Sequence, residues 1–329
     1  MKRSLELPPW SGWALGFAII CFVGLVLLVV RRNRGIKRSL FSSPYTLWMV
    51  LFTVIPCVLV TYYALTDING GFTLENFANF WDSNYTVNHM YAELGEEYGV
   101  LIQRGTVNID ILLYSLWMAL FCTLICLVVG YPAAFFMADR EIKFGSTIVV
   151  LFIIPMWMNF LLRTIAWMTL LEDQGLINTA LKSIGLSGIQ LMYNNSAVLL
   201  GMVYNFLPFM VFPIYTSLSK MDVKLLEAAQ DLGANPRRTF LRVTMPLSLP
   251  GVISGITMVF MPSVTTFFIP RILGGGNTMM FGDLIENKFL TENNWGVGSA
   301  LSLIMMVLIL ASLGVLRKAD PEGEGGGMI

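Results

Sequence analysis

The chain has 329 residues, of which 56% are hydrophobic and 13% charged, with 21 basic and 21 acidic residues. A water-soluble domain carries roughly a quarter charged residues, so this composition excludes an ordinary soluble protein and indicates long segments that face lipid. The basic residues flank apolar runs and form no patch interleaved with aromatic residues, which argues against nucleic-acid binding.

Apolar runs of about 20 residues, the length needed to cross a bilayer, recur along the chain. A backbone in hydrocarbon must satisfy its own hydrogen bonds, so each run is predicted to be a helix. The sequence therefore predicts an all-α integral membrane protein. Its expected spans are residues 10–30, 45–65, 111–136, 146–171, 197–218, 251–269 and 299–316.

The first run, residues 10–30, follows a basic start and so resembles a secretory signal peptide. Its apolar part is too long for that, and no small-residue cleavage site follows it. A basic linker comes next, with Arg31, Arg32, Arg34, Lys37 and Arg38. The run is therefore predicted to be a retained anchor helix with its N-terminus outside.

Further basic residues gather in alternate loops, as the positive-inside rule requires of cytoplasmic loops. The predicted cytoplasmic residues are Arg140, Lys143, Lys220, Lys224, Arg237, Arg238, Arg242, Arg317 and Lys318. The loops predicted to lie outside hold few basic residues, namely Arg104, Lys182, Arg271 and Lys288. The predicted topology places the N-terminus outside and the C-terminus in the cytoplasm.

The predicted external loops are acidic. Their carboxylates are Asp67, Glu75, Asp82, Glu93, Glu96, Glu97, Asp110, Glu172, Asp173, Asp283, Glu286 and Glu292. One interpretation is that such loops are merely depleted in Lys and Arg. The other is a negative vestibule that concentrates cations or meets the surface of a partner.

Prolines inside the predicted spans are expected to kink the helices and to help shape a cavity. They are Pro132, Pro155, Pro208 and Pro213. The four cysteines also fall inside apolar runs, which excludes a disulfide framework. Cys122 and Cys126 share one helical face and are interpreted as packing residues. His89 is the only histidine, so no metal site is expected.

Between the fifth and sixth predicted spans lies a polar stretch that is predicted to form two short helices joined by a sharp turn. Asp222 is expected to cap the first helix, and Gly233 to end it in the left-handed conformation. Asn235 is expected to cap the second, with Pro236 at its first position, where a missing N–H costs nothing. The expected apolar face of the first helix is Leu225, Leu226, Ala229 and Leu232.

Pro246 and Pro250 are predicted to end the second of these helices. On physical grounds alone the stretch has two interpretations. The paired alanines after Glu227 leave a smooth helix surface that would fit a groove on another protein, with the carboxylate at its edge. Alternatively, the stretch is an amphipathic connector that lies on the membrane surface.

The spacing in this stretch resembles the EAA loop of ABC-importer permeases. The family pattern is E-A-A-x3-G-x9-I-x-L-P, and here Val243 and Met245 replace Ile and Leu. In that family the loop forms the coupling helix that seats in the ATP-binding subunit. Carried over to this chain, the expected docking residues are Glu227, Ala228, Ala229, Gly233 and Pro246.

A wider resemblance, over about residues 45–316, is to the permeases of spermidine/putrescine importers. It is carried by strings that begin at Tyr114, Gly130, Ile154, Leu162, Leu207 and Leu226. The resemblance implies the MetI-like fold of type I importers, with six core helices and one extra N-terminal helix. The implied parts are an extra helix and linker at 1–44, a first core helix and acidic loop at 45–110, a permease core at 111–316 with the EAA loop at 222–251, and a flexible tail at 317–329.

No G-x-x-x-x-G-K-[ST] phosphate loop occurs in the sequence, so the chain is expected to be no enzyme and to carry no cofactor. The resemblance places ATP and magnesium on a partner ATPase. It implies two PotA-like ATP-binding subunits, a PotC-like second permease and a PotD-like external binding protein, in a bacterial inner membrane. ATP binding would then move the coupling helices and switch the pore from inward- to outward-facing.

A polyamine would be held by carboxylates and aromatic faces. The candidates for this path are Trp157, Trp167, Glu172, Asp173 and Tyr204, although each is also an ordinary helix-end, packing or lipid-facing residue. Arg163 is a charge inside a predicted span and cannot bind a cation directly. It is expected to bridge helices or to pair with an acidic residue of the partner permease. For an anionic substrate it would instead be the prime ligand.

Other functions remain open at this point. One is a related importer for ferric iron, thiamine, sulfate, molybdate or another anion, because those permeases share the EAA loop. Another is a membrane anchor or assembly protein whose surface helix merely resembles that loop. An intramembrane enzyme is disfavoured, because the spans hold no plausible catalytic group.

Overall fold

The computed structural model describes residues 45, 47–67, 70–81, 107–139, 145–275 and 278–319. The residues up to Val60 form one compact unit and those from Thr61 onward form a second, and each is described by itself. The predicted first span and its basic linker, most of the acidic loop that precedes residue 107, and the C-terminal tail lie outside the described residues.

The described residues form helices joined by turns and loops, with one isolated bridge between Thr66 and Phe72. In chain order the elements are the π-helix η1 (Val50–Val54), α3 (Ile55–Leu65), α4 (Glu75–Trp81), α6 (Val107–Ala138), α7 (Gly145–Trp157), α8 (Phe160–Leu171), α9 (Leu176–Ser183), α10 (Asn195–Ser219), α11 (Val223–Asp231), α12 (Pro236–Thr239), the π-helix η3 (Phe240–Thr244), α13 (Met245–Thr265), α14 (Phe268–Leu273), α15 (Phe281–Leu290) and α16 (Trp295–Ala319).

Within the described residues, five helices are long and apolar enough to cross a membrane, and a bent pair makes up to six. The five are Leu47–Leu65, Asn108–Ala138, Asn195–Ser219, Pro236–Thr265 and Trp295–Gly314. This confirms the predicted all-α membrane class. Every predicted span from residue 45 onward has a counterpart, although two of them differ in form.

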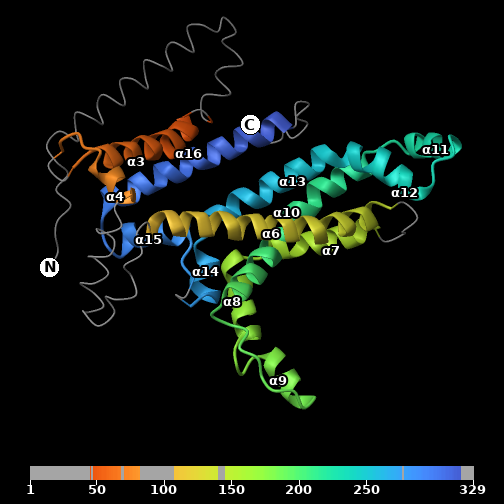
Figure 1. Ribbon diagram of the computed structural model, residues 1–329, viewed down its shortest axis with the longest axis horizontal. Helices are drawn as coiled ribbons and strands as arrows, with labels where there is room; N and C mark the ends of the chain where they lie inside the picture. Colours follow the sequence, from red (N-terminus) through yellow and green to blue (C-terminus); the bar gives the residue numbers. More distant parts are fainter. Residues whose placement is uncertain are drawn as a thin grey trace, which may run out of the picture. The chain divides into compact units, whose positions relative to one another are not determined.

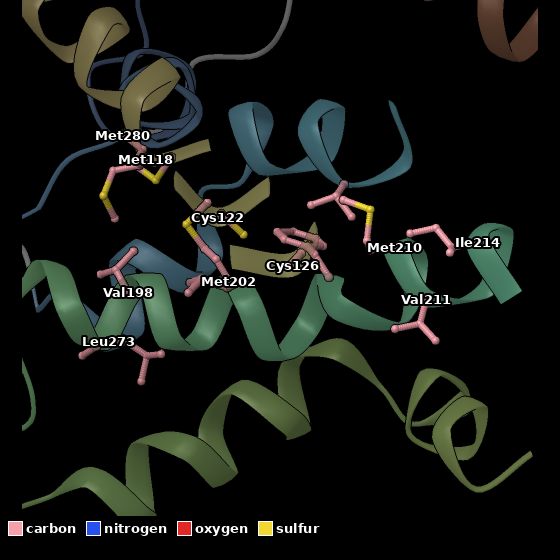
Figure 2. Close-up of a cluster of buried hydrophobic side chains, with 14 of the residues drawn as sticks. Met118, Cys122, Cys126, Val198, Met202, Met210, Val211, Ile214, Leu273 and Met280 are labelled. Atoms are coloured by element: carbon pink, nitrogen blue, oxygen red, sulfur yellow. The ribbon is translucent and has the colours of Figure 1, made fainter. Parts of the chain in front are cut away.

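The main core lies between α6, α10 and α13, which run side by side (Figure 1). Figure 2 shows Cys122, Cys126, Met202 and Met210 among its buried side chains. Both thiols are fully buried, and the Oγ of Ser263 in α13 lies 3.7 Å from the Sγ of Cys122 in α6. The two cysteines thus occupy the packed centre of the helix group.

Glycines let α10 and α13 approach closely. A Cβ added at Gly255 would lie 2.8 Å from the Sδ of Met210, and one at Gly251 would lie 2.7 Å from the carbonyl oxygen of Pro213. Their four-residue spacing puts both on one face, as in other close helix pairs of membrane proteins. Gly130 of α6 faces the same Met210 side chain, 3.1 Å from its Cγ. Met210 is therefore seated between two glycines of neighbouring helices.

The predicted span at 146–171 is broken into two helices in the structure. The chain there forms α7 and α8, and the segment Thr147–Trp157 meets the segment Phe160–Ser183, which runs on through α9, at an angle of 95°. Pro155 cannot donate a hydrogen bond to the preceding turn, and two residues later α7 ends. The Asn159 side chain then accepts a hydrogen bond from the backbone N–H of Leu161 at 2.8 Å. This cap starts a new helix in a new direction.

The prediction that Pro246 and Pro250 end the second docking helix is wrong. The chain is helical without interruption from Pro236 to Thr265, through α12, η3 and α13. In η3 the N–H of Met245 bonds to the carbonyl of Phe240, five residues back. The backbone hydrogen bonds there already follow the wider π-helical pattern, so the helix continues although Pro246 has no N–H to donate. The same arrangement precedes Pro56, which follows the π-turn η1.

The sixth predicted span, 251–269, therefore begins earlier and ends earlier in the structure. The Thr265 hydroxyl donates to the carbonyls of Met261 and Pro262 at 3.3 Å, which satisfies acceptors at the end of α13. Thr266 is extended, and the short helix α14 follows as a separate element.

A second, smaller core joins α4, α15 and α16 to the start of α6. Phe80, Phe281 and Leu301 are buried in it, and the hydroxyl of Ser115 accepts the backbone N–H of Phe281 at 2.7 Å. Figure 1 shows this group at the opposite end of α6 from α11 and α12. The two ends of the main helix group thus carry different sets of short helices.

Candidate functional site

The predicted docking helix is α11, and its ends form as expected. The side chain of Asp222 accepts the N–H of Lys224 at 3.0 Å. Gly233 has a φ of 81°, a value that L side chains rarely adopt, and the following N–H of Ala234 bonds to the carbonyl of Ala229 at 3.0 Å. A glycine here lets the chain reverse within two residues.

α11 is a surface element, and none of its residues is buried. Its apolar residues do not all turn to one side: Leu226 and Ala229 are half-buried, whereas Leu225 is exposed. Leu232, at the end of the helix, is 89% exposed. Glu227 and Ala228 are exposed as well. The helix therefore presents apolar side chains together with a carboxylate on its free face.

The helix after the turn leads directly into the main helix group. Asn235 caps it by accepting the N–H of Arg238 at 2.9 Å. Phe240 then packs edge-on against two aromatic rings of α6, Tyr131 at 6.0 Å and Phe135 at 5.4 Å between ring centroids. A hydrogen bond of 2.9 Å joins the hydroxyls of Tyr131 and Ser248, which ties α6 to α13 just beyond. α11 is thus linked to two long helices through a compact aromatic contact.

The predicted substrate-path residues fall into three places. Trp167 of α8 and Tyr204 of α10 meet edge to face, with ring centroids 5.2 Å apart. Trp157 is 86% exposed at the end of α7, before the bend, so it belongs to the other arm of the bent pair. Glu172 and Asp173 lie just past the end of α8 and are exposed.

The Glu172–Asp173 turn is held by a residue that sequence reasoning missed. Asn178 of α9 is buried, and its amide donates to the carbonyls of Glu172 and Ile189 at 3.2 and 3.0 Å. Its Oδ1 accepts the N–H of Ile189 at 2.9 Å. A single asparagine in a polar loop gives no sequence signal for such a role. It keeps the two carboxylates in one compact turn.

Arg163 lies in α8 with 7% of its surface exposed. Among the described residues, its Nε and Nη1 are buried without a hydrogen-bond partner. Tyr204 is near enough to act on it electrostatically, and Trp167 follows it by one turn of the same helix. Arg163, Trp167 and Tyr204 therefore form one cluster between α8 and α10.

Several predicted external carboxylates have partners of their own. Glu286 pairs with Arg271 and Glu292 with Lys288, at 2.6 and 2.7 Å between nitrogen and oxygen. Burial raises the pKa of the Asp283 carboxyl, and nearby Glu286 raises it further, while Arg271 opposes both. These three acids therefore add less free negative charge than their number suggests.

Across the described ranges, no group of three or more His, Cys, Asp or Glu side chains is placed to hold a metal ion.

Known proteins share both sequence and fold with this chain. Residues 127–322 match the family described as binding-protein-dependent transport system inner membrane component. The chain is 35% identical over 281 residues to the spermidine/putrescine transport system permease protein PotB of Escherichia coli K12, which covers 83% of this chain and 94% of that protein. The corresponding protein of Haemophilus influenzae is 33% identical, over 83% of this chain and 90% of that protein.

The fold is similar to that of a chain in the crystal structure of a bacterial ABC transporter involved in the import of the acidic polysaccharide alginate. The TM-score is 0.63 at 13% sequence identity, over 90% of this chain and 99% of that chain. The family match covers more than half of the sequence, and the helical arrangement agrees with it. The chain belongs to the binding-protein-dependent transport system inner membrane components, the non-catalytic, multi-pass permease subunits of ABC importers.

Proposed function

We propose that this chain is the permease subunit of a polyamine importer, with spermidine or putrescine as its cargo. The observation that carries the proposal is its identity of 33–35% with PotB proteins over 83% of its length. The exposed carboxylates of Glu172 and Asp173 and the aromatic pair Trp167–Tyr204 supply the chemistry that a flexible polycation needs.

The permease works within a larger assembly. ABC importers of this family combine permeases with ATPase and binding-protein partners. Here we assign two PotA-like ATPase subunits, which hold ATP and magnesium, a PotC-like second permease and a PotD-like binding protein. The N-terminus faces outside and the C-terminus the cytoplasm, which puts α11 on the ATPase side. In this assignment Glu227, Ala228, Ala229, Gly233 and Pro246 form or support the docking surface.

Movement of α11 reaches the pore through η3. When ATP binding shifts the docked helix, the continuous helix from Pro236 to Thr265 moves with it. Phe240 presses on Tyr131 and Phe135 of α6, so α6 is driven together with α13. The ATPase supplies the free energy, and the packed helices supply two discrete arrangements.

Phe240→Ala is expected to uncouple ATP hydrolysis from transport. The change removes two edge-to-face contacts, each worth about 0.5–1.5 kcal/mol, but leaves α11 and its caps untouched. We expect the ratio of spermidine moved to ATP hydrolysed to fall about tenfold in reconstituted vesicles, with ATPase subunits still bound. Leu241→Ala, at an exposed neighbouring position, is the matched control. An unchanged ratio in Phe240→Ala would exclude this route.

The cargo is tested by ATP-driven uptake of labelled spermidine into vesicles that contain the whole importer. Unlabelled putrescine should compete, whereas thiamine, ferric citrate and sulfate should not. If the vesicles take up one of those solutes and no spermidine, the chain belongs to a related importer and the proposed polyamine cargo is wrong.

Neutralising both outer carboxylates, with Glu172→Gln and Asp173→Asn together, should weaken uptake at low spermidine concentration. Two exposed ion pairs are worth about 1–2 kcal/mol in total, which corresponds to a rise in KM of roughly tenfold. Glu286→Gln is the control, because that carboxylate already pairs with Arg271. Identical KM values for the double variant and the unchanged protein would remove these two residues from the path.

A further inference from the structure

Arg163 carries a buried charge whose partner is missing from the described part of the chain. Its Nε and Nη1 are buried there without a hydrogen-bond acceptor. A guanidinium stays protonated in proteins, so it cannot escape burial by losing its charge. An unpaired buried charge costs several kcal/mol, and proteins almost always supply a hydrogen-bonding anion.

The described spans offer no carboxylate near Arg163. The acids that follow it in the chain, Glu172 and Asp173, lie nine and ten residues further on, about 13–15 Å along a helix axis. Both are exposed to the surroundings past the end of α8. Tyr204, the neighbour on α10, offers a phenol hydroxyl and not a carboxylate. The anion therefore comes from outside this part of the chain.

The depth of Arg163 argues against a lipid phosphate. α7 has 13 residues and so rises about 20 Å, and the basic residues Arg140 and Lys143 just before it mark the cytoplasmic interface. The bend after Trp157 then lies well inside a hydrocarbon core of about 30 Å. Arg163 lies in the first turn of α8, about 5 Å along the helix axis from Phe160, so it remains near that depth. Headgroup phosphates lie at the edges of the core.

The break between α7 and α8 must itself be covered by protein or line an aqueous path. Lipid cannot satisfy the backbone groups that a helix break leaves open. The side chains around the break are nevertheless uncovered in this chain, since Trp157 is 86% and Leu162 61% exposed. A neighbouring subunit that packs here would cover both the break and the approach to Arg163.

We propose that Arg163 pairs with a carboxylate supplied by the second permease subunit, so that the two permeases are joined by a buried ion pair beside the Trp167–Tyr204 aromatic pair. The inference rests on the proposed function, because that assembly includes a second permease. It also removes an obstacle to cation transport. A bare guanidinium beside the aromatic pair would repel a polyamine, whereas a neutralised one does not.

Charge reversal in the complete importer tests the pairing. Arg163→Glu should reduce both co-purification of the second permease and spermidine uptake at least tenfold. Each acidic residue in the predicted spans of the second permease is then changed to Arg in that background. One of these reversals should restore co-purification and uptake to within about threefold of the unchanged complex, which a merely structural loss would not allow.

A neutral variant makes the test independent of misfolding. Arg163→Met keeps the length and apolar stem of the side chain, and Lys220→Met removes an exposed cation at the end of α10 as a control. Arg163→Met that assembles and transports within twofold of Lys220→Met would overturn the proposal. So would a failure of every reversal to rescue Arg163→Glu.

Two further outcomes would assign the anion to another source and overturn the proposal. One is loss of assembly by the unchanged importer when chloride is replaced by gluconate. The other is loss of assembly by the unchanged importer in vesicles made without anionic lipid. The cargo is judged separately: an importer that moves another solute fails the polyamine assignment, while co-purification of the two permeases still decides the role of Arg163.

Discussion

Replacing Glu227 with lysine in the assembled importer is expected to abolish ATP-driven uptake while the chain remains inserted in the membrane. Glu227 is exposed on α11, which has no buried residue, so the change should not disturb the fold. Its carboxylate is free to meet the ATPase. Losing one member of a charge pair at an interface costs about 2–5 kcal/mol, or roughly thirtyfold to several thousandfold in affinity. Reversing the sign adds repulsion.

The measurement combines uptake into vesicles with co-purification of the ATPase. Asp231→Lys makes the same change of charge one turn along the same exposed helix, at a variable position of the EAA pattern, and should retain most of both activities. Normal uptake in Glu227→Lys would mean that α11 does not dock through this residue. Equal losses in the two variants would point to a general effect of charge.

Glu292→Ala is expected to lower the free energy of unfolding by about 3–5 kcal/mol, because it leaves the buried ammonium group of Lys288 without its carboxylate partner. Lys288 is 1% exposed, and its Nζ lies 2.7 Å from both carboxylate oxygens of Glu292, one helical turn later in sequence. The lysine sits at the junction of α15 and α16, so the end of the smaller core should loosen first. Thermal unfolding in detergent, followed by loss of the co-purified partners, measures the effect.

The pair between Arg271 and Glu286 is the matched control. Its arginine side chain is 58% exposed, so Glu286→Ala should cost less than about 1 kcal/mol. The double change Lys288→Met with Glu292→Leu should recover much of the lost stability, since an apolar pair leaves no charge unpaired. Similar unfolding temperatures for Glu292→Ala and Glu286→Ala would show that the burial of Lys288 contributes little.

Local signals predicted the ends of α11 and the start of α12 well. Asp222, Gly233 and Asn235 act within their own few residues, through a side-chain cap or a single backbone angle, and all three behave as expected. The membrane spans were predictable for a similar reason, because a run of about 20 apolar residues has few alternatives in a bilayer. The fold class followed from the apolar runs, and the family from the resemblance of residues 227–246 to the EAA loop and of the wider chain to spermidine/putrescine permeases.

The positions of helix breaks were less predictable. Pro155 is followed by a break and Pro246 is not, although both are prolines in apolar surroundings. The difference lies in the neighbouring residues: Asn159 caps a new helix after the first, whereas a π-turn precedes the second. Whether the helix breaks at Pro155 or continues through Pro246 depends on how the residues around each proline pack, and the presence of proline alone does not decide it.

Tertiary placement accounts for the remaining differences. Lys288 was predicted to lie in an external loop, yet it is buried, because α15 packs into the smaller core. Nothing in the local sequence singles out Phe240. Its contact with Tyr131 and Phe135 depends on residues more than a hundred positions away in the sequence. Such long-range contacts leave no periodic pattern to find.

In the proposed coupling, the unbroken helix from Pro236 to Thr265 has the geometry of a lever. Its 30 residues give it a length of about 45 Å, so a tilt of about 5° at the docking end displaces the opposite end by about 4 Å. That displacement is comparable to the radius of an α-helix with its side chains. A modest rocking of the ATPase is thus geometrically sufficient to open or close a narrow passage at the far side of the membrane, without any change in the helix's own hydrogen bonding.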